Sequence, residues 1–179
     1  MTLLLRSWDM LRDGTYTTTL SGKSTVSVRV VLKRGWRLDV YLHVGDDHRP
    51  AVTHFVSLGK QRVTVVDIFG NAPGSPWHRA GLSALAVNTA IQFLKVLYPP
   101  STPIRGHIVG ARDAQRQEER RAFWRSFGFD ITAPDRRSDE HLRGTVESVR
   151  LLPGLVFGEH PRILDITTFT QVEESKASP

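Results

Sequence analysis

Two residues with acid–base side chains stand in apolar surroundings. Asp67 lies near the end of the valine-rich segment 62–70, and His107 follows Gly106 in the short apolar segment 103–109. A carboxylate in such a segment needs a partner, so Asp67 is either a base, one half of a salt bridge, or a cap on the following loop. Histidine is the side chain whose unperturbed pKa lies closest to neutral, so His107 is either a general base or a hydrogen-bonded strand histidine. Both residues are therefore candidates for moving a proton at neutral pH.

A glycine-containing turn separates a strand from a long helix. Segment 62–69 is rich in β-branched residues, which predicts a core strand. Loop-forming residues follow at Gly70, Pro73, Gly74 and Pro76. Apolar residues at helical spacing then continue for about five turns until Pro99 and Pro100 end the helix. This face comprises Leu82, Leu85, Ala86, Thr89, Phe93 and Val96. The helix N-terminus presents backbone N–H groups and a positive dipole end, so the turn predicts an anion site.

Composition limits the protein class. The chain has 179 residues, which fits one domain, and its lack of cysteine excludes disulfides, thiolate nucleophiles and zinc–thiolate sites. No apolar run approaches the roughly 20 residues of a membrane helix, and the leucines at 3–5 are too few for a signal peptide. We therefore expect a cytoplasmic protein with no membrane partner. The net charge of +6 favours an acidic partner, such as a polyphosphate cofactor or nucleic acid, or simply an arginine-rich solvated surface.

An antiparallel meander of three or four strands is predicted before the core strand. Alternating apolar residues indicate strands at 26–30, 38–44 and 52–58, and residues 3–13 predict a short strand leading into a helix. The sequence SGKST at 21–25 resembles the end of a phosphate-binding loop. It lacks that motif's first glycine, because Thr17 stands there, so a hairpin turn is favoured.

The second half predicts a strand, a helix and further strands. Segment 103–109 is a strand in which Gly106 indicates a bulge or a close approach by another group. Segment 114–127 is a helix that Gly128 caps, and its packed face comprises Ala122, Phe123, Trp124 and Phe127. On another face, Arg112, Arg116 and Arg120 predict a solvated, salt-bridged surface.

The predicted C-terminal elements begin with a strand at 129–132. A charged loop at 134–144, a strand at 145–152 and one more strand within 155–170 follow. The predicted domain spans 1–171, with a meander at 15–69, a core at 62–132 and C-terminal strands at 145–170. Residues 172–179 are expected to form a disordered tail.

Two motifs resemble those of the GNAT (Gcn5-related N-acetyltransferase) family. HRAGLSA at 78–84 is similar to that family's Q/R-x-x-G-x-G/A turn, which cradles the acetyl-CoA pyrophosphate on backbone amides. RRAFWRSFGFD at 120–130 looks like its closing helix and the exit into the next strand. The resemblance covers roughly 37–152. It implies a single α/β domain with a mixed, mostly antiparallel sheet flanked by helices, splayed where the core strand meets 103–109.

The resemblance also implies an activity and a site. The activity is acetyl-CoA-dependent acetyl transfer to an unidentified amine acceptor, with Asp67 and His107 as the catalytic candidates. The pantetheine arm would lie between the core strand and 103–109. The implied cofactor-binding residues are Ile68, Phe69, Gly70, His78, Arg79, Ala80, Gly81, Leu82, Ser83 and Trp124.

Two departures from the family pattern keep a second function open. His78 and Ser83 replace a basic or amide residue and a glycine in the turn, although Arg79 can supply a cation. Trp124 stands where the family carries a tyrosine that protonates the leaving thiolate, and indole is no acid at neutral pH. The alternative is a catalytically degenerate GNAT-like domain that acts as a CoA-binding or protein or nucleic-acid interaction module.

Other partners follow from weaker features. Nucleic acid remains a candidate because of the arginines, although no interleaving of aromatic residues in the sequence marks a base-stacking platform. A homodimer also remains open. His43 and His54 could face each other across the meander, but without a third ligand we expect no metal site.

Overall fold

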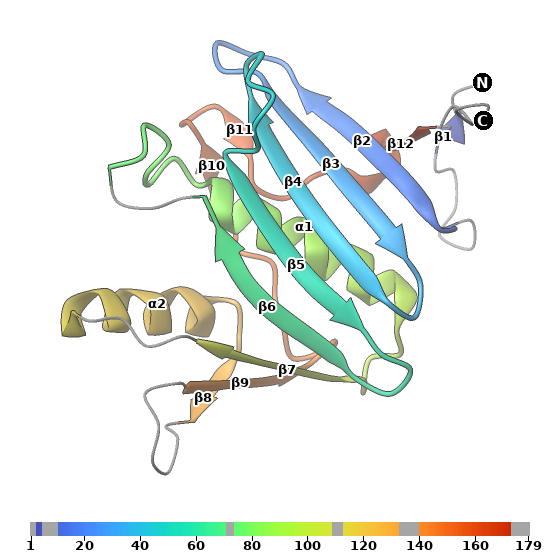
Figure 1. Ribbon diagram of the computed structural model, residues 1–179, viewed down its shortest axis with the longest axis vertical. Helices are drawn as coiled ribbons and strands as arrows, with labels where there is room; N and C mark the ends of the chain where they lie inside the picture. The colour runs from blue at the N-terminus through green and yellow to red at the C-terminus, as the bar shows by residue number, and fades with distance from the viewer. Residues whose placement is uncertain (1–2, 5–10, 71–73, 109–112, 133–139, 173–179) are drawn as a thin grey trace, which may run out of the picture.

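The computed structural model describes residues 3–4, 11–70, 74–108, 113–132 and 140–172, apart from the side chains of Leu3, Leu4 and Asp67. Its main feature is a ten-stranded sheet in the order β1-β12-β2-β3-β4-β5-β6-β7-β9-β8, with α1 packed behind it (Figure 1). All strand pairs in this sheet are antiparallel except β6 with β7. The predicted fold class, a mixed and mostly antiparallel sheet flanked by helices, is therefore confirmed.

The N-terminal strands form the expected meander. Consecutive strands pair in chain order: β2 (Gly14–Leu20), β3 (Val26–Lys33), β4 (Arg37–Val44), β5 (Val52–Leu58) and β6 (Val63–Phe69). Residues 21–25 connect β2 to β3, so the hairpin prediction for SGKST is correct. Outside the meander, β1 (Leu3–Leu4) pairs with β12 (Thr170–Val172). A helix within 3–13 is not found at 11–13, and 5–10 lie outside the described residues.

The core strand β6 lies inside the sheet, and its parallel partner β7 (Pro103–Ile108) separates from it. The two strands pair at only three positions, the last being Val65 with Gly106, although both continue further. A Cβ added to Gly106 would lie 2.8 Å from the Val65 carbonyl oxygen, so only glycine allows this approach. The register of β7 is regular on both sides. The predicted close approach and the predicted splay are both confirmed.

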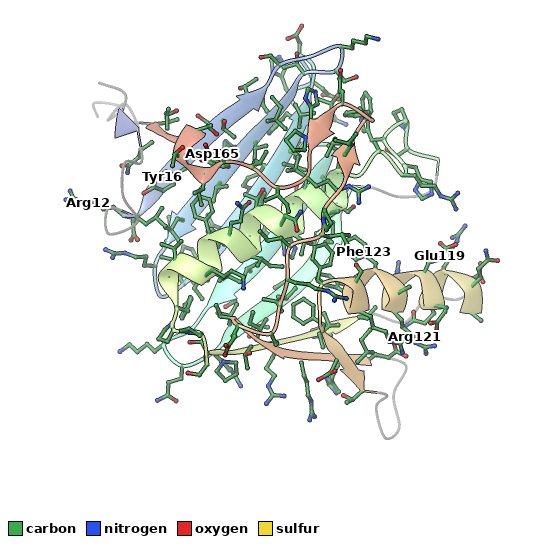
Figure 2. The ribbon with its side chains drawn as sticks, turned by 180° about the vertical axis from the view of Figure 1, so that it is seen from behind. Arg12, Tyr16, Glu119, Arg121, Phe123 and Asp165 are labelled. Atoms are coloured by element: carbon green, nitrogen blue, oxygen red, sulfur yellow. The ribbon has the colours of Figure 1, made fainter. Side chains whose placement is uncertain are left out.

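Helix α1 (Leu82–Leu97) ends where the sequence predicts. Tyr98 is extended, as expected for a residue that precedes a proline. The helix is buried over most of its length and not on one face alone, because the C-terminal segment crosses its outer side (Figure 2). Asn88 binds the backbone of that segment at Leu152 and Arg162, and Gln92 donates to the carbonyl of Leu164 at 2.7 Å.

The C-terminal strands differ from the prediction. The segment expected to be a charged loop contains β9 (Glu140–Thr145), which pairs with β7 along its whole length and with β8 (Asp130–Thr132). In place of the expected strand at 145–152, a turn at 146–148 follows β9 and leads into irregular chain, and Val146 and Val149 are buried. The sequence predicts a loop at β9 because the segment is charged. In the folded protein, however, a strand accommodates these charges. Its outward residues are solvated, and its inward Glu140 binds side chains of α2 (Ala114–Ser126).

Residues 155–172 form short elements. A two-stranded hairpin of β10 (Leu155–Val156) and β11 (His160–Pro161) is followed by the short 3-10 helix η2 (Ile166–Thr168) and by β12, which joins the main sheet between β1 and β2. The additional strand expected within 155–170 therefore corresponds to these three short strands. The expected disordered tail lies outside the described residues from 173 onward.

On α2, the packed face was predicted correctly at its aromatic positions. Trp124 and Phe127 are buried and Phe123 is partly buried, whereas Ala122 is exposed and does not belong to this face. Gly128, with a φ of +85°, ends the helix as predicted. Arg112 lies outside the described residues, and Arg116 and Arg120 are exposed as expected. No helix in the described part of the chain is long and apolar enough to cross a membrane.

Candidate functional site

The turn before α1 has the backbone that the sequence predicts. Gly81 lies immediately before the helix with a φ of 89° and a ψ of 2°, a conformation that favours glycine. Its carbonyl accepts the first helical bond, from the N–H of Leu85 at 3.1 Å, so the N–H groups of the first turn have no acceptor within the helix. His78 and Arg79 precede it, and both side chains are exposed. The turn thus combines a helix N-terminus with two basic side chains.

A feature absent from the sequence prediction covers one side of this turn. The β10–β11 hairpin packs beside it, and the N–H of Phe157 donates to the Ala80 carbonyl at 2.9 Å. The ring of Phe157 meets that of Trp77 edge-on at 5.7 Å. Arg162, in the same segment, donates from Nε to the Leu155 carbonyl at 3.0 Å, and the same nitrogen is 3.0 Å from where a Cβ of Gly81 would be. A third cation therefore stands at the N-terminus of α1.

The hairpin is held in place by the turn between β2 and β3. The carboxylate of Glu159 accepts from the backbone N–H groups of Ser24 at 2.8 Å and Lys23 at 3.2 Å. These bonds, that from Ser24 foremost, hold the pKa of Glu159 below its usual range. The ring of His160 also contacts the Ser24 carbonyl at 2.6 Å. The segment that resembled a phosphate-binding loop thus fixes the hairpin.

Asp67 lies in a β-bulge of the core strand. Val65 pairs with Val56 and Ile68 pairs with His54, so Val66 and Asp67 together oppose a single residue of β5. A bulge changes the direction of the following backbone and is common beside functional sites. It begins directly after Val65, the last residue of β6 that pairs with β7. The side chain of Asp67 is outside the described residues, so its roles as base, ion-pair partner or cap remain predictions.

His107 lies on the other side of the splay. It is one residue beyond Gly106, the last residue of β7 that pairs with β6, and its side chain is exposed on the sheet face opposite α1. Its neighbour across β9 is His141. The imidazole is therefore accessible to a ligand at the place where the strands separate.

Trp124 is buried among aromatic rings. Its side chain is 5% exposed and lies among the rings of His54, Phe127 and Phe129, with centroids at 6.1, 6.4 and 5.6 Å. These rings connect α2 to the core strands. Its predicted contact with a cofactor is not tested by this arrangement.

Helix α2 is fixed on β9 by a buried carboxylate. Glu140 accepts from Gln117 Nε2 at 3.0 Å and from Arg121, which binds it with both Nε and Nη2. The guanidinium of Arg121 is the main reason why the pKa of Glu140 is lowered. This contact holds α2 in place, and with it the aromatic exit motif.

The two histidines considered for a metal site, His43 and His54, do not face each other. His54 pairs with Val40 on β4, and its side chain lies on the α1 face, whereas His43 points to the opposite face. The geometry thus contradicts the facing pair. Within the described residues no cluster of three or more metal-ligating side chains occurs.

Apart from Trp124, the predicted site residues fall into two groups. One group lies around the point where β6 leaves β7 and comprises Asp67, Ile68, Phe69, Gly70 and His107. The other group, residues 78–83, forms the turn before α1. The arrangement offers backbone N–H groups and cations to an anion near the part of β6 that, within the described residues, no longer pairs with β7. Sequence reasoning missed Arg162, since it lies about 80 residues away and no local pattern marks it.

Several solved structures are similar to this chain, among them the following three. A GNAT-family protein from Desulfovibrio desulfuricans has a TM-score of 0.46 at 17% identity, covering 62% of this chain and 69% of its own. A protein from Sphaerobacter thermophilus assigned as an acetyltransferase has a TM-score of 0.43 at 16% identity, covering 72% and 98%. The ribosomal-protein-S18-alanine N-acetyltransferase of Escherichia coli has a TM-score of 0.42 at 14% identity, covering 62% and 68%. These likenesses concern fold and not chemistry.

No protein-family model matches the sequence, and no curated protein does.

Proposed function

We propose that this protein is an acyl-CoA-dependent N-acetyltransferase that acts on an amine. The observation that carries the proposal is the separation of β6 from β7 beyond Val65 and Gly106, with a bulge at 66–67 and a helix N-terminus at the end of the same connection. Such an opening suits an extended thioester ligand: a strand edge can pair with its amides, and the helix can bind its phosphates.

The phosphates of the acyl-CoA would lie at the turn before α1. There the backbone N–H groups and the dipole favour an anion. His78 and Arg79 are exposed beside it, and Arg162 adds a cation from the hairpin. The pantetheine amides would pair with the backbone of residues 68–70, because β6 has no described strand partner beyond Val65 on its β7 side.

The chemistry needs a base, a donor to the carbonyl oxygen and a proton for the leaving group. The acceptor amine loses a proton to His107 or Asp67, and its nitrogen attacks the thioester carbonyl. Collapse of the tetrahedral intermediate breaks the C–S bond and releases the thiolate of CoA, which then takes a proton. His107 is exposed beside the opening and can serve either proton transfer.

The lack of a tyrosine at 124 slows this step without preventing it. General acid assistance is worth about a hundred- to ten-thousandfold in rate. A thiolate is also a good leaving group, since the pKa of a free thiol is about 8.5. Water or His107 can therefore supply the last proton. If the protein shows no turnover, the buried indole at position 124 supports the alternative function, a CoA-binding module.

Binding is tested by thermal unfolding with acetyl-CoA, free CoA and longer acyl-CoAs. A ligand at a hundredfold excess over its Kd should stabilise the fold by about 2.7 kcal/mol. Gly81 is a poor site for an acidic substitution, since a Cβ there would lie 2.7 Å from the Leu155 carbonyl oxygen. Ser83→Asp is better, because a carboxylate in the first turn stabilises the helix while it repels phosphate.

The matched variants separate phosphate repulsion from a change in shape. Ser83→Asp should abolish the shift with acetyl-CoA, whereas the neutral Ser83→Asn should retain it. Arg162→Gln should weaken binding, and Arg125→Gln, on the exposed face of α2, should not. If Ser83→Asp binds like wild type, the phosphates do not lie at this turn.

Turnover is tested on a panel of amines with acetyl-CoA. His107→Ala and Asp67→Asn should lower kcat and leave the thermal shift unchanged, since neither is expected to touch the phosphates. If both variants transfer acetyl to an accepted amine with the kcat of wild type, neither residue is the base. Binding of acetyl-CoA without transfer to any amine would favour the CoA-binding module.

A further inference from the structure

We propose that the sheet face opposite α1 binds single-stranded nucleic acid. We call the outward side of β3, β4, β5 and β6 the open face, since no described helix covers it. Figure 1 looks onto it, with α1 behind the strands. The inference uses none of the residues assigned to the phosphates or to the base, and it shares only Phe69 with the segment proposed to pair with pantetheine.

A continuous row of side chains crosses four strands of the open face. Arg29 of β3 lies over the ring of Tyr41 at 4.6 Å. The rings of Tyr41 and Phe55 are 6.2 Å apart, and those of Phe55 and Phe69 are 5.8 Å apart. The row ends in solvent, because Phe69 is 52% exposed. Bases can stack on such rings regardless of sequence, since every base has a π-face.

A second exposed ring lies at the other end of the same face. Trp36 is 58% exposed, and its ring is flanked by Lys33 at 5.2 Å and Arg37 at 4.7 Å. Its carbonyl accepts from Leu58 at one end of β5, whereas Phe69 pairs with Thr53 near the other end. Five residues of strand separate these positions, or roughly 17 Å. A chain of several nucleotides can span this distance and stack at both ends.

The charges around these rings suit a phosphate backbone. Arg29 and Lys33 are exposed on β3, and Arg105 and Arg143 continue the face onto β7 and β9, where they are directly opposite each other. Among the described side chains of β3 to β6, the one acid on this face is Asp39. It is 2% exposed, and Arg37 lies 3.2 Å away. The face therefore presents cations to solvent and no accessible carboxylate from the described part of these strands.

The same charges disfavour the other occupants of an exposed sheet face. Two copies of this chain packed face to face would bring like charges together at a symmetric interface, which costs free energy. Duplex nucleic acid hides its bases, so the exposed rings would find nothing on which to stack. A flexible single strand can use both the cations and the rings.

Fluorescence anisotropy with the full chain and a labelled 15-nucleotide oligothymidylate tests the proposal. Oligouridylate, a duplex and an abasic strand of the same length provide comparison. We expect both single strands to bind, and the abasic strand and the duplex to bind at least tenfold more weakly. The affinity for the single strands should fall with salt, because phosphate contacts release counterions.

Matched variants locate the site. Phe69→Ala and Trp36→Ala should each weaken binding by about five- to a hundredfold, the range of one stacked base. Ile163→Ala, an exposed apolar residue outside the open face, should have no effect. Arg29→Gln should lower the slope of log affinity against log salt by about 0.7, while Arg116→Gln on α2 should not change it.

Three outcomes would overturn the proposal. Equal binding of the abasic strand would show attraction by charge alone. Equal losses in the control and open-face variants would place the site elsewhere. A sedimentation equilibrium dimer that Phe69→Ala dissociates, together with no binding of either single strand, would assign the open face to a second copy.

Discussion

The two faces of the N-terminal sheet come from the same strands and have opposite properties. The face toward α1 is built from valine and leucine side chains with no exposed surface, such as Val28, Val30, Leu38, Val40 and Leu42. The open face alternates with it and carries arginine, threonine and aromatic side chains. Burial on the first face stabilises the fold. The second face contributes less to stability and is available for binding.

The α1 face should be the more sensitive to substitution, and Asn88→Ala should have the largest effect. Asn88 has no exposed surface and makes three hydrogen bonds to the backbone of residues 152 and 162. Its loss should leave these groups unpaired and lower the free energy of unfolding by about 3 kcal/mol. Urea unfolding measures this change.

A control on the same helix indicates whether the number of bonds matters. Gln92→Ala loses one bond to the segment that crosses α1, so it should lower the free energy of unfolding by only about 1 kcal/mol. Equal effects of the two substitutions would mean that Asn88 does not anchor the C-terminal segment.

The contact between β6 and β7 should be next in sensitivity. Gly106→Val would place atoms against the backbone of Val65, which cannot move aside, and should cost about 2 kcal/mol in urea unfolding. Gly144→Ala on β9 is a control, because its closest contacts, at 3.3 Å, are side-chain atoms of Phe129 and Ser148. A destabilisation no greater than that of Gly144→Ala would show that the strands can separate further without cost.

The attachment of α2 to β9 should depend on pH. Glu140→Gln should lower the free energy of unfolding by about 1.5 kcal/mol at pH 7, because it weakens hydrogen bonds to a charged group. The lowered pKa of Glu140 in the folded protein means that this stabilisation is fully present above the unfolded value of about 4.5. It is lost as the pH falls through the folded pKa.

The pH measurement has a simple contrast. The difference between wild type and Glu140→Gln should shrink below about pH 4.5 and vanish at lower pH. Glu118→Gln removes a carboxylate that Arg121 also contacts, but at an exposed position, and should have a smaller effect. A difference between wild type and Glu140→Gln that is constant from pH 7 to pH 3 would exclude the ion pair as its source.

The open face should show the smallest effect on stability. Phe69→Ser replaces a ring that is half exposed, so the free energy of unfolding should change by no more than about 0.5 kcal/mol. The same variant should bind oligothymidylate far more weakly. A loss of stability as large as that of Gly106→Val would mean that the aromatic row belongs to the core and that the two faces do not differ in this way.

Local patterns determined most of the fold. Alternation of apolar residues correctly predicts β3, β4 and β5, and the prolines at 99 and 100 correctly end α1. These predictions succeed because strand alternation, helical spacing and proline sterics act over a few residues. The prediction failed at β9, where Glu140 looks like a loop residue until Arg121, 19 residues away along the chain, is placed beside it.

The turn at 78–83 and the break at Gly106 could likewise be predicted from sequence, since glycine conformations and helix ends are local. Tertiary structure alone decided three things. It brought Arg162 to the N-terminus of α1, it packed the β10–β11 hairpin beside the turn at 78–83, and it aligned Arg29, Tyr41, Phe55 and Phe69 into one row. In the sequence these aromatic residues are more than ten positions apart and show no interleaving. Strand register places them side by side, and register depends on contacts between distant segments of the chain.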